Sequence, residues 1–222
     1  NIHQEAQRAY LYLIEILDKK SAEPYFLPLV EAAFRQESFD LVEDYAARYF
    51  YDYPEGKDKE KIELTLAKAL FEEKKYDQAI AKLPSPLPDD PDFAVFTGLL
   101  YYHGNQFDKA TETLGSLHKS GHLTDPMYIF MLAESLFMTR DYQQAKEIFK
   151  LLSDDDQNIA QILYRLAEIE RHLDHQDEAL KYLQKLVEKE GTSVWKSAAV
   201  KELEVKKFME DFNKTKTKLN KK

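Results

Sequence analysis

The chain repeats one pattern of residue types along most of its length. A polar turn is usually followed by an aromatic residue, then by a small residue three positions later and a large apolar residue four positions beyond that, as in EKKYDQAIAKL (73–83), GNQFDKATETL (104–114), TRDYQQAKEIF (139–149) and DHQDEALKYL (174–183). From Ala9 to Ala179 the pattern advances 170 residues in five steps, a mean period of 34 residues. This period is typical of a solenoid of helix-turn-helix repeats, in which each repeat buries its apolar face against its neighbours.

Each period also contains a second apolar stripe, which precedes the polar turn. Its apolar residues recur at helical spacings of three and four, as in Phe93, Phe96, Leu99 and Tyr102, and again in Ile129, Leu132, Leu136 and Phe137. Small residues stand where the two helices are expected to cross, namely Gly98, Ala133 and Ala167 on the first helix and Ala79, Ala110, Ala145 and Ala179 on the second. A larger side chain there would push the helices apart, at about 1–3 kcal/mol per site.

Composition supports an all-α chain and excludes several classes of function. Only 6 Gly and 8 Pro occur in 222 residues, too few turn residues for an all-β protein, and the prolines cluster between Pro84 and Pro91. The net charge of -9 argues against nucleic acid as a partner, because phosphate binding needs a basic face. The chain has no cysteine, which excludes disulfides and thiolate metal sites. It has no apolar run long enough for a membrane span.

The repeats resemble the tetratricopeptide repeat family. Three of them carry much of the family's signature, in Gly98, Tyr101, Phe107 and Ala110, in Leu132-Ala133, Tyr142, Ala145 and Phe149, and in Leu166-Ala167, Ala179 and Leu183, while Pro54 and Pro91 occupy the closing-proline position. Short phrases such as KLVEKEGTSVWKSAA and YDYPEGKDKE are similar to segments of bacterial members. The resemblance implies an all-α, right-handed superhelical α-solenoid of about five helix pairs, with a preceding helix and a C-terminal capping helix.

The repeat pattern also predicts how the chain is divided. We expect a repeat domain over residues 22–190, with repeats at about 23–56, 60–90, 91–124, 126–158 and 160–191. Residues 1–20 form a helix that is either half of an incomplete repeat or an N-terminal cap, and residues 192–213 form a helix that caps the last repeat. Residues 214–222 are a basic tail. Because residue 1 is Asn, we expect a fragment or a processed form, so the sequence leaves the compartment open between cytoplasm and periplasm.

No sequence motif indicates catalysis, a cofactor or a metal. P-loop, GxGxxG, HExxH, GxSxG and EF-hand patterns are absent. The pairs His118 with His122 and His172 with His175 flank turns and do not share one helical face, so we interpret them as packing or solvated side chains. The sequence therefore predicts a protein that is not an enzyme and needs no cofactor.

In the tetratricopeptide family the first helix of each repeat lines the inner face of the superhelix. The resemblance places Leu27, Leu64, Val95, Phe130 and Tyr164 at one inward position, and Phe34, Phe71, Tyr102, Phe137 and Arg171 at a second. Lys68, Glu134 and Glu168 are among their polar neighbours. Two interpretations stay open: the side chains form a groove for an extended peptide or a partner helix, or they fill the gaps between adjacent repeats.

These patterns predict a protein-interaction scaffold whose partner binds in the concave groove. The carboxylate clamp of chaperone-binding members is disfavoured, because the corresponding positions carry Glu31, Lys68, Leu99, Glu134 and Glu168, with no Asn. An acidic, aromatic groove would instead prefer a basic or apolar segment. Two alternatives are a structural module that self-associates through the N-terminal helix, and a regulatory part of a larger protein.

Overall fold

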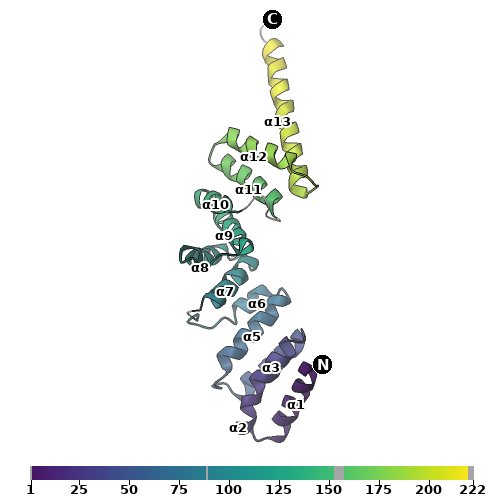
Figure 1. Cartoon of the computed structure of the whole chain (residues 1–222), viewed down its shortest axis with the longest axis vertical. Coiled ribbons are helices and arrows are strands. Elements are labelled where there is room, and N and C mark those ends of the chain that lie inside the picture. The colour runs from purple at the N-terminus through teal and green to yellow at the C-terminus, as the bar shows by residue number, and fades with distance from the viewer. Residues whose placement is uncertain (1, 89, 153–157, 220–222) are drawn as a thin grey trace. The chain divides into compact units, whose positions relative to one another are not determined.

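The computed structural model describes residues 2–88, 90–152 and 158–219. Every regular element within these ranges is a helix, which confirms the all-α prediction (Figure 1). The helices are α1 (Ile2–Ile16), α2 (Lys19–Ala22), the short 3-10 helix η1 (Glu23–Tyr25), α3 (Phe26–Phe34), α4 (Phe39–Asp52), α5 (Lys59–Glu72), α6 (Tyr76–Ile80), α7 (Pro91–His103), α8 (Phe107–Lys119), α9 (Pro126–Met138), α10 (Tyr142–Phe149), α11 (Ile159–His172), α12 (Gln176–Glu188) and α13 (Val194–Leu219).

Ten of these helices alternate as first and second members of five pairs, the architecture of an α-solenoid. The first helices are α3, α5, α7, α9 and α11, and each second helix follows its partner after a short turn. The chain divides into two compact halves, Asn1–Thr113 and Leu114–Lys222. Helices α3 and α4 pack together in the N-terminal half, as do α5 and α6, and α9 packs on α10 and α11 on α12 in the C-terminal half.

The small residues predicted at the helix crossings are buried. Ala79, Ala110 and Ala145 have no exposed surface, and Ala179 is 2% exposed. On the first helices Ala133 and Ala167 are fully buried as well. Their burial confirms the prediction, because a side chain that ends at Cβ lets the backbones of two helices approach closely.

Each pair of helices is joined by the same backbone turn. In each turn the residue just before the second helix donates its backbone N–H to the carbonyl five positions earlier, near the end of the first helix. One residue of each turn has a positive φ: Glu37, Lys74, Asn105, Arg140 and Asp174. In the fourth pair, Asp141 N donates to Leu136 O at 2.9 Å and Arg140 N donates to Phe137 O at 3.0 Å. These two bonds define a Schellman motif, which satisfies the carbonyls at the helix end.

Prolines and capping residues separate the repeats. Helix α6 is only five residues long and ends before the proline-rich segment that starts at Pro84. Asp90 caps α7 by accepting a hydrogen bond from Phe93 N at 2.7 Å, with Pro91 in the first turn. Asp125 caps α9 in the same way, and Ser193 Oγ accepts from Lys196 N at 3.0 Å at the start of α13.

Helix α1 buries a different face from the one that the repeat pattern predicts. Ala9, which we aligned with the buried alanines, is exposed, and the buried residues of α1 are Gln7 and Ile14. Gln7 Nε2 donates to Tyr45 Oη at 3.0 Å, and Gln36 Nε2 donates to Gln7 Oε1 at 2.9 Å. Helix α1 packs on α3 with Gln7 and Ile14 on its buried face. The polar contacts of Gln7 reach the turn after α3 and helix α4, and Ala9 is left on the outer side.

Helix α13 packs on the last repeat only through its N-terminal part. Trp195, Ala199 and Leu203 join the apolar cluster of α11 and α12. The helix continues to Leu219, beyond residue 213 where we expected the capping helix to end, so the first part of the basic tail is helical. Residues 220–222 lie outside the described residues. Within the described part of the chain, no helix is both long and apolar enough to cross a membrane.

The repeated positive φ generates a stability prediction. Arg140 is exposed at φ 66°, and an L side chain is strained in this region whereas glycine is not. We expect Arg140→Gly to raise the free energy of unfolding by about 0.5–1 kcal/mol. Asn105→Gly should change it less, because Asn tolerates this conformation. Urea unfolding of both variants measures their free energies of unfolding. A lower value for Arg140→Gly than for the wild type would contradict strain in this turn.

Candidate partner-binding surface

Aromatic side chains at the second inward position pack against the turn aromatic of their own repeat. The ring centroids are 5.6 Å apart for Phe71 and Tyr76, and 5.7 Å apart for Phe137 and Tyr142. The same pair occurs in the first and third repeats, as Phe34 with Phe39 at 5.9 Å and Tyr102 with Phe107 at 6.0 Å. The fifth repeat has Arg171 and Gln176 in these places. The side chains at this position are partly buried, so they contribute to packing and keep some accessible surface.

Two histidines stack on the turn aromatics of the preceding repeat. The ring of His103 lies 5.3 Å from that of Tyr76 at an interplanar angle of 20°, and the ring of His172 lies 4.3 Å from that of Tyr142 at 4°. Burial lowers the pKa of His103 below its usual 6.5, so its ring is neutral at pH 7. These histidines fill gaps between repeats, in agreement with the packing role that we expected for the histidines.

The N-terminal half contains a four-ring group, here called the Phe71 cluster, formed by Phe71, Tyr76, Phe96 and His103. Phe71 lies 5.7 Å from Phe96 and 5.5 Å from His103 between ring centroids. The Lys68 side chain is exposed, and its Nζ lies 6.0 Å from the ring centroid of Phe96. A cavity of about 230 Å³ adjoins the cluster, lined by residues of two turns, Lys74–Gln78 and His103–Asn105. The cluster thus combines an apolar platform with one exposed cation.

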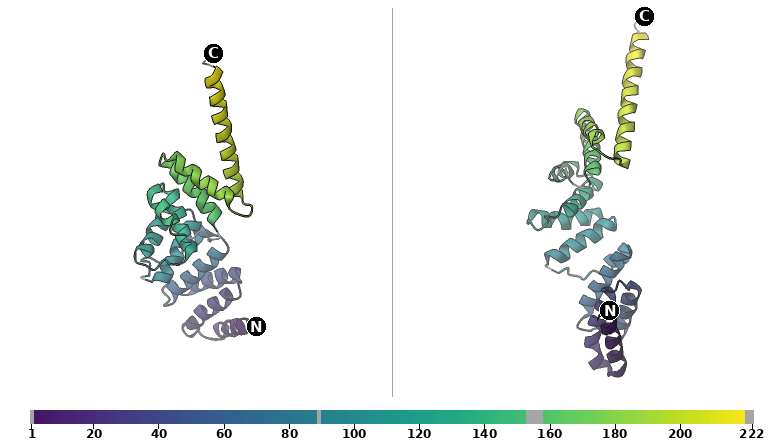
Figure 2. Two further views of the ribbon diagram at one scale, coloured as in Figure 1. Left: turned by 45° about the horizontal axis from the view of Figure 1, so that its top comes forward. Right: turned by 45° about the vertical axis from the view of Figure 1, so that its right-hand side comes forward.

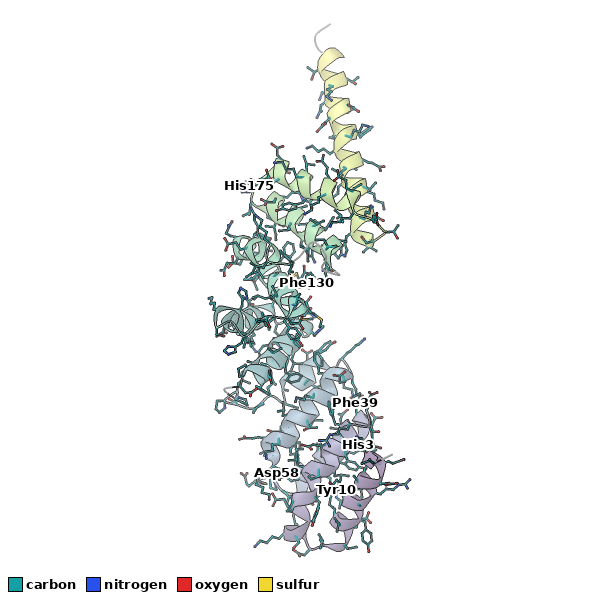
Figure 3. All side chains as sticks on the ribbon, viewed as in Figure 1. His3, Tyr10, Phe39, Asp58, Phe130 and His175 are labelled. Atoms are coloured by element: carbon teal, nitrogen blue, oxygen red, sulfur yellow. The ribbon has the colours of Figure 1, made fainter. Side chains whose placement is uncertain are left out.

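The first inward position is less open. Leu64 and Val95 are partly buried, and Phe130 on α9 is only 7% exposed (Figure 3). The Phe130 ring packs against Phe149 of the paired helix at 5.9 Å. These residues contribute more to the contact between helices than to an accessible surface.

In the C-terminal half a half-buried arginine connects the last two repeats. Arg165 binds Glu134 through two contacts, Nε to Oε1 at 2.8 Å and Nη2 to Oε2 at 3.2 Å, and binds Glu168 at 2.7 Å. Its guanidinium also lies 4.5 Å from the ring centroid of Phe137 and 5.4 Å from that of Trp195. Glu134 is 5% exposed. The acidic side chains that we expected to select a basic partner are therefore neutralised within the chain.

Helix α13 engages two further candidate residues. Glu202 accepts hydrogen bonds from Tyr164 Oη at 2.5 Å and from Arg171 Nη1 at 2.5 Å. The ring of Tyr164 lies 5.3 Å from that of Trp195. Burial and the bond to Glu202 raise the pKa of Tyr164 above its usual 10.0. Phe137, Tyr164 and Arg171 thus all contact other side chains of the C-terminal half.

Sequence reasoning missed Arg165, Phe96 and Glu202 as members of these groups. Arg165 follows the inward Tyr164 directly, and Glu134 stands 31 residues before it, close to one repeat length. That spacing was the available signal, because residues one period apart lie side by side in adjacent repeats. For Glu202 no such signal exists, because α13 lies outside the repeat pattern.

One group of three carboxylates could be mistaken for a metal site. Oxygen atoms of Asp40, Glu43 and Glu73 lie within 4.8 Å of one another, and no other such group occurs among the described residues. However, Lys75 Nζ lies 2.6 Å from Glu43 and 3.2 Å from Glu73. The ammonium group therefore supplies the positive charge that a metal would otherwise bring.

Comparison with known proteins agrees with this geometry. A family model described as tetratricopeptide repeat matches residues 128–156 and 161–193. MamA of strain AMB-1 shares the fold over 79% of this chain and 96% of its own, at 18% identity and a TM-score of 0.62. MamA from Desulfovibrio magneticus RS-1 covers 78% of this chain and 96% of its own, at 15% identity and a TM-score of 0.57. YrrB is described as a TPR protein with an unusual peptide-binding site. It covers 72% of this chain and 84% of its own, at 16% identity and a TM-score of 0.58. No curated protein sequence matches.

The succession of helix pairs defines an α-solenoid of helical repeats. Its last two repeats match the tetratricopeptide repeat model, and the solved proteins MamA and YrrB share the fold of the chain.

The Arg165 contacts generate a second prediction. Replacing Arg165 with Met leaves Glu134 buried without its cation, so we expect the free energy of unfolding to fall by about 3 kcal/mol. The double variant Arg165→Met with Glu134→Met should recover most of this loss, because it removes both charges. Thermal and urea unfolding measure both. Equal destabilisation by the single and double variants would contradict the pairing.

Glu170 generates a prediction about pH. Glu170 is 1% exposed, and its carboxylate lies 2.8 Å from Lys146 Nζ and 2.9 Å from Nδ1 of His175, the N-cap residue of α12. Figure 3 labels His175. Burial alone would raise the pKa of Glu170, but the bonds from Lys146 and His175 outweigh it and hold the pKa below its usual 4.5. Ionised Glu170 therefore stabilises the fold above pH 4.5, and this contribution is lost as the pH falls through the lowered pKa.

We expect Glu170→Gln to be less stable than the wild type at pH 7, with a difference that shrinks as the solution is acidified below pH 4.5. Unfolding curves at several pH values measure the difference in free energy of unfolding between the variant and the wild type. A difference that stays constant across that range would show that Glu170 does not titrate as described.

Proposed function

We propose that this protein binds an extended peptide segment or a helix of another protein on the inner face of its N-terminal half, over the Phe71 cluster. The observation that carries the proposal is the exposed Lys68 beside the partly buried rings of Phe71 and Phe96. Aromatic side chains supply much of the binding energy at protein interfaces, and a neighbouring charge adds selectivity. The peptide-binding site ascribed to YrrB supports a peptide as the class of ligand.

The two halves differ in what their candidate residues can offer. In the C-terminal half, Phe137 lies under Arg165, and Tyr164 and Arg171 bind Glu202. A partner would have to displace these contacts before it reached the residues. In the N-terminal half, Lys68 has only a long contact with an aromatic ring to lose. We therefore centre the site on Lys68, Phe71 and Phe96, with Phe34, Leu64, Val95 and Tyr102 as its margins.

The proposed ligand carries an apolar anchor next to an acidic residue. The anchor would lie against the rings of Phe71 and Phe96, and the acidic group would pair with Lys68. This differs from the basic segment suggested by the sequence, because Glu134 and Glu168, on which that suggestion rested, are bound by Arg165. The role is one of binding, with no catalytic step.

Selection of peptides from a phage-displayed random library on the whole protein tests this proposal. We expect the selected peptides to share a large apolar residue beside Asp or Glu, and Lys68→Glu to weaken their binding about tenfold or more. Fluorescence anisotropy of labelled peptides measures the dissociation constants.

Lys109→Glu provides a matched control. Lys109 is also exposed, and its Nζ lies 5.2 Å from the ring centroid of Tyr101, but it belongs to the second helix of its repeat. This variant should bind the peptides as the wild type does. Peptides that bind both variants equally well would contradict the proposed site.

The outer face of α1 favours a second candidate function, self-association through the N-terminal helix. Ile2, Tyr12 and Ile16 are 81%, 63% and 56% exposed, and Ala9 lies on the same side of the helix. Such an apolar face suits either a second copy of this chain or another repeat. The double substitution Tyr12→Asp with Ile16→Asp should abolish any association that uses this face, which sedimentation measures.

A further inference from the structure

The distal part of α13 carries apolar side chains that contact no other helix of its half. Val205, Phe208 and Phe212 are 63%, 68% and 55% exposed, and Met209 beside them is 49% exposed. The rings of Phe208 and Phe212 lie 6.5 Å apart in a stacked arrangement. Figures 1 and 2 show this part of α13 extending clear of α11 and α12 in every view. Large apolar side chains grouped in this way on an exposed helix indicate an interaction surface.

This surface is not a continuation of the face that caps the last repeat. The packed residues Trp195, Ala199 and Leu203 follow one another at intervals of four along the helix. At 3.6 residues per turn, the face carrying Val205, Phe208 and Phe212 points roughly 140° away from them. The capping function therefore does not explain the exposed residues, and a partner on this face would not have to displace the repeats.

The exposed face has the spacing of a coiled coil. Ala198, Lys201, Val205, Phe208, Phe212 and Thr215 follow one another in alternating steps of three and four. This is the heptad pattern, with Ala198, Val205 and Phe212 at a and Lys201, Phe208 and Thr215 at d. The polar residues Lys201 and Thr215 bound the apolar seam on either side. We propose that this seam pairs with the same seam of a second copy of the chain, as a parallel two-stranded coiled coil.

The charges beside the seam favour the parallel orientation. Asp211 takes a g position and Lys216 an e position, so in a parallel pair each Asp211 faces Lys216 of the other copy, twice by symmetry. An antiparallel pair that matches Val205 with Phe208 places Glu204 beside Asp211 of the other copy, where like charges repel. The seam is short, so the dimer dissociates at low concentration.

A membrane surface fits this helix less well than a second copy does. Helices that lie on membranes carry Lys and Arg over their polar face. Here Lys206, Lys207 and Lys214 alternate with Glu204, Glu210 and Asp211, and the structure has ion pairs between Lys206 and Glu210 and between Lys214 and Asp211. The mixed charge gives little attraction to anionic lipid and suits a helix in water.

Sedimentation velocity of the whole protein over a range of concentrations tests the proposal. We expect a monomer–dimer equilibrium, and we expect Phe208→Ala with Phe212→Ala to weaken dimerisation about tenfold or more. Both side chains are exposed, so the helical signal in circular dichroism should not change. The control, Lys207→Ala with Glu210→Ala, alters the opposite face and should dimerise as the wild type does.

Single cysteines test the orientation, because the chain has none of its own. Equivalent a and d residues face each other in a parallel pair, so Thr215→Cys should form a disulfide-linked dimer under mild oxidation, and Glu210→Cys on the outer face should not. The charge swap Asp211→Lys with Lys216→Asp should dimerise better than either single substitution.

Three outcomes would overturn the proposal. One is a monomer at every concentration, and another is a dimer that the substitutions at Phe208 and Phe212 leave unchanged but those at Tyr12 and Ile16 abolish. The third is a monomer that instead binds vesicles of phosphatidylcholine and phosphatidylserine through Phe208 and Phe212. None of these outcomes bears on peptide binding at Lys68, which lies in the other half of the chain.

Discussion

The close crossing of two helices at a small residue is the contact on which the rest of this structure depends. Ala79, Ala110, Ala145 and Ala179 are all 2% exposed or less, one in each second helix from the second repeat onward, and the buried Val42 takes this position in the first repeat. An alanine at a crossing lets a 34-residue repeat bury its apolar stripes with short helices, because the two backbones can come close together. The Schellman turn that ends each first helix then returns the chain at a fixed angle, so the same residue positions recur from one repeat to the next.

Despite this regularity, equivalent positions of the first helices make different contacts in the two halves. Phe71 keeps accessible surface beside the exposed Lys68, and on these two side chains the proposed binding site rests. Arg165 instead forms an ion pair with the buried Glu134 and contacts Trp195 near the start of α13, so its contacts stabilise the end of the repeat array. A buried carboxylate such as Glu134 is tolerable only with its cation, which makes the end of the array sensitive to the loss of one side chain.

The sequence predicted the helix pairs and the buried alanines, because each depends on residues close together in the chain. It did not predict the direction of α1, since the contact between Gln7 and Tyr45 joins residues 38 positions apart and involves polar groups that no apolar pattern reports. The sequence also did not predict the positive φ of Glu37 and Arg140, because those turns contain no glycine. The sequence could predict the candidate site only as a face of the first helices. It could not predict which of these residues stay accessible, because Arg165 binds Glu134 of the preceding repeat and Glu202 of α13 binds Tyr164 and Arg171.

Two alanines of α6 allow the most direct measurement of the central contact. Ala79 is fully buried at the repeated small-residue position, and Ala81, the C-cap residue of the same helix, is exposed. The account predicts that Ala79→Leu lowers the free energy of unfolding by about 1–3 kcal/mol, while Ala81→Leu changes it by less than about 0.5 kcal/mol. Urea unfolding of the two variants compares the same change of side chain within one helix. Equal effects, or a stabilising Ala79→Leu, would contradict the claim that the helix pairs depend on a small residue at their crossing.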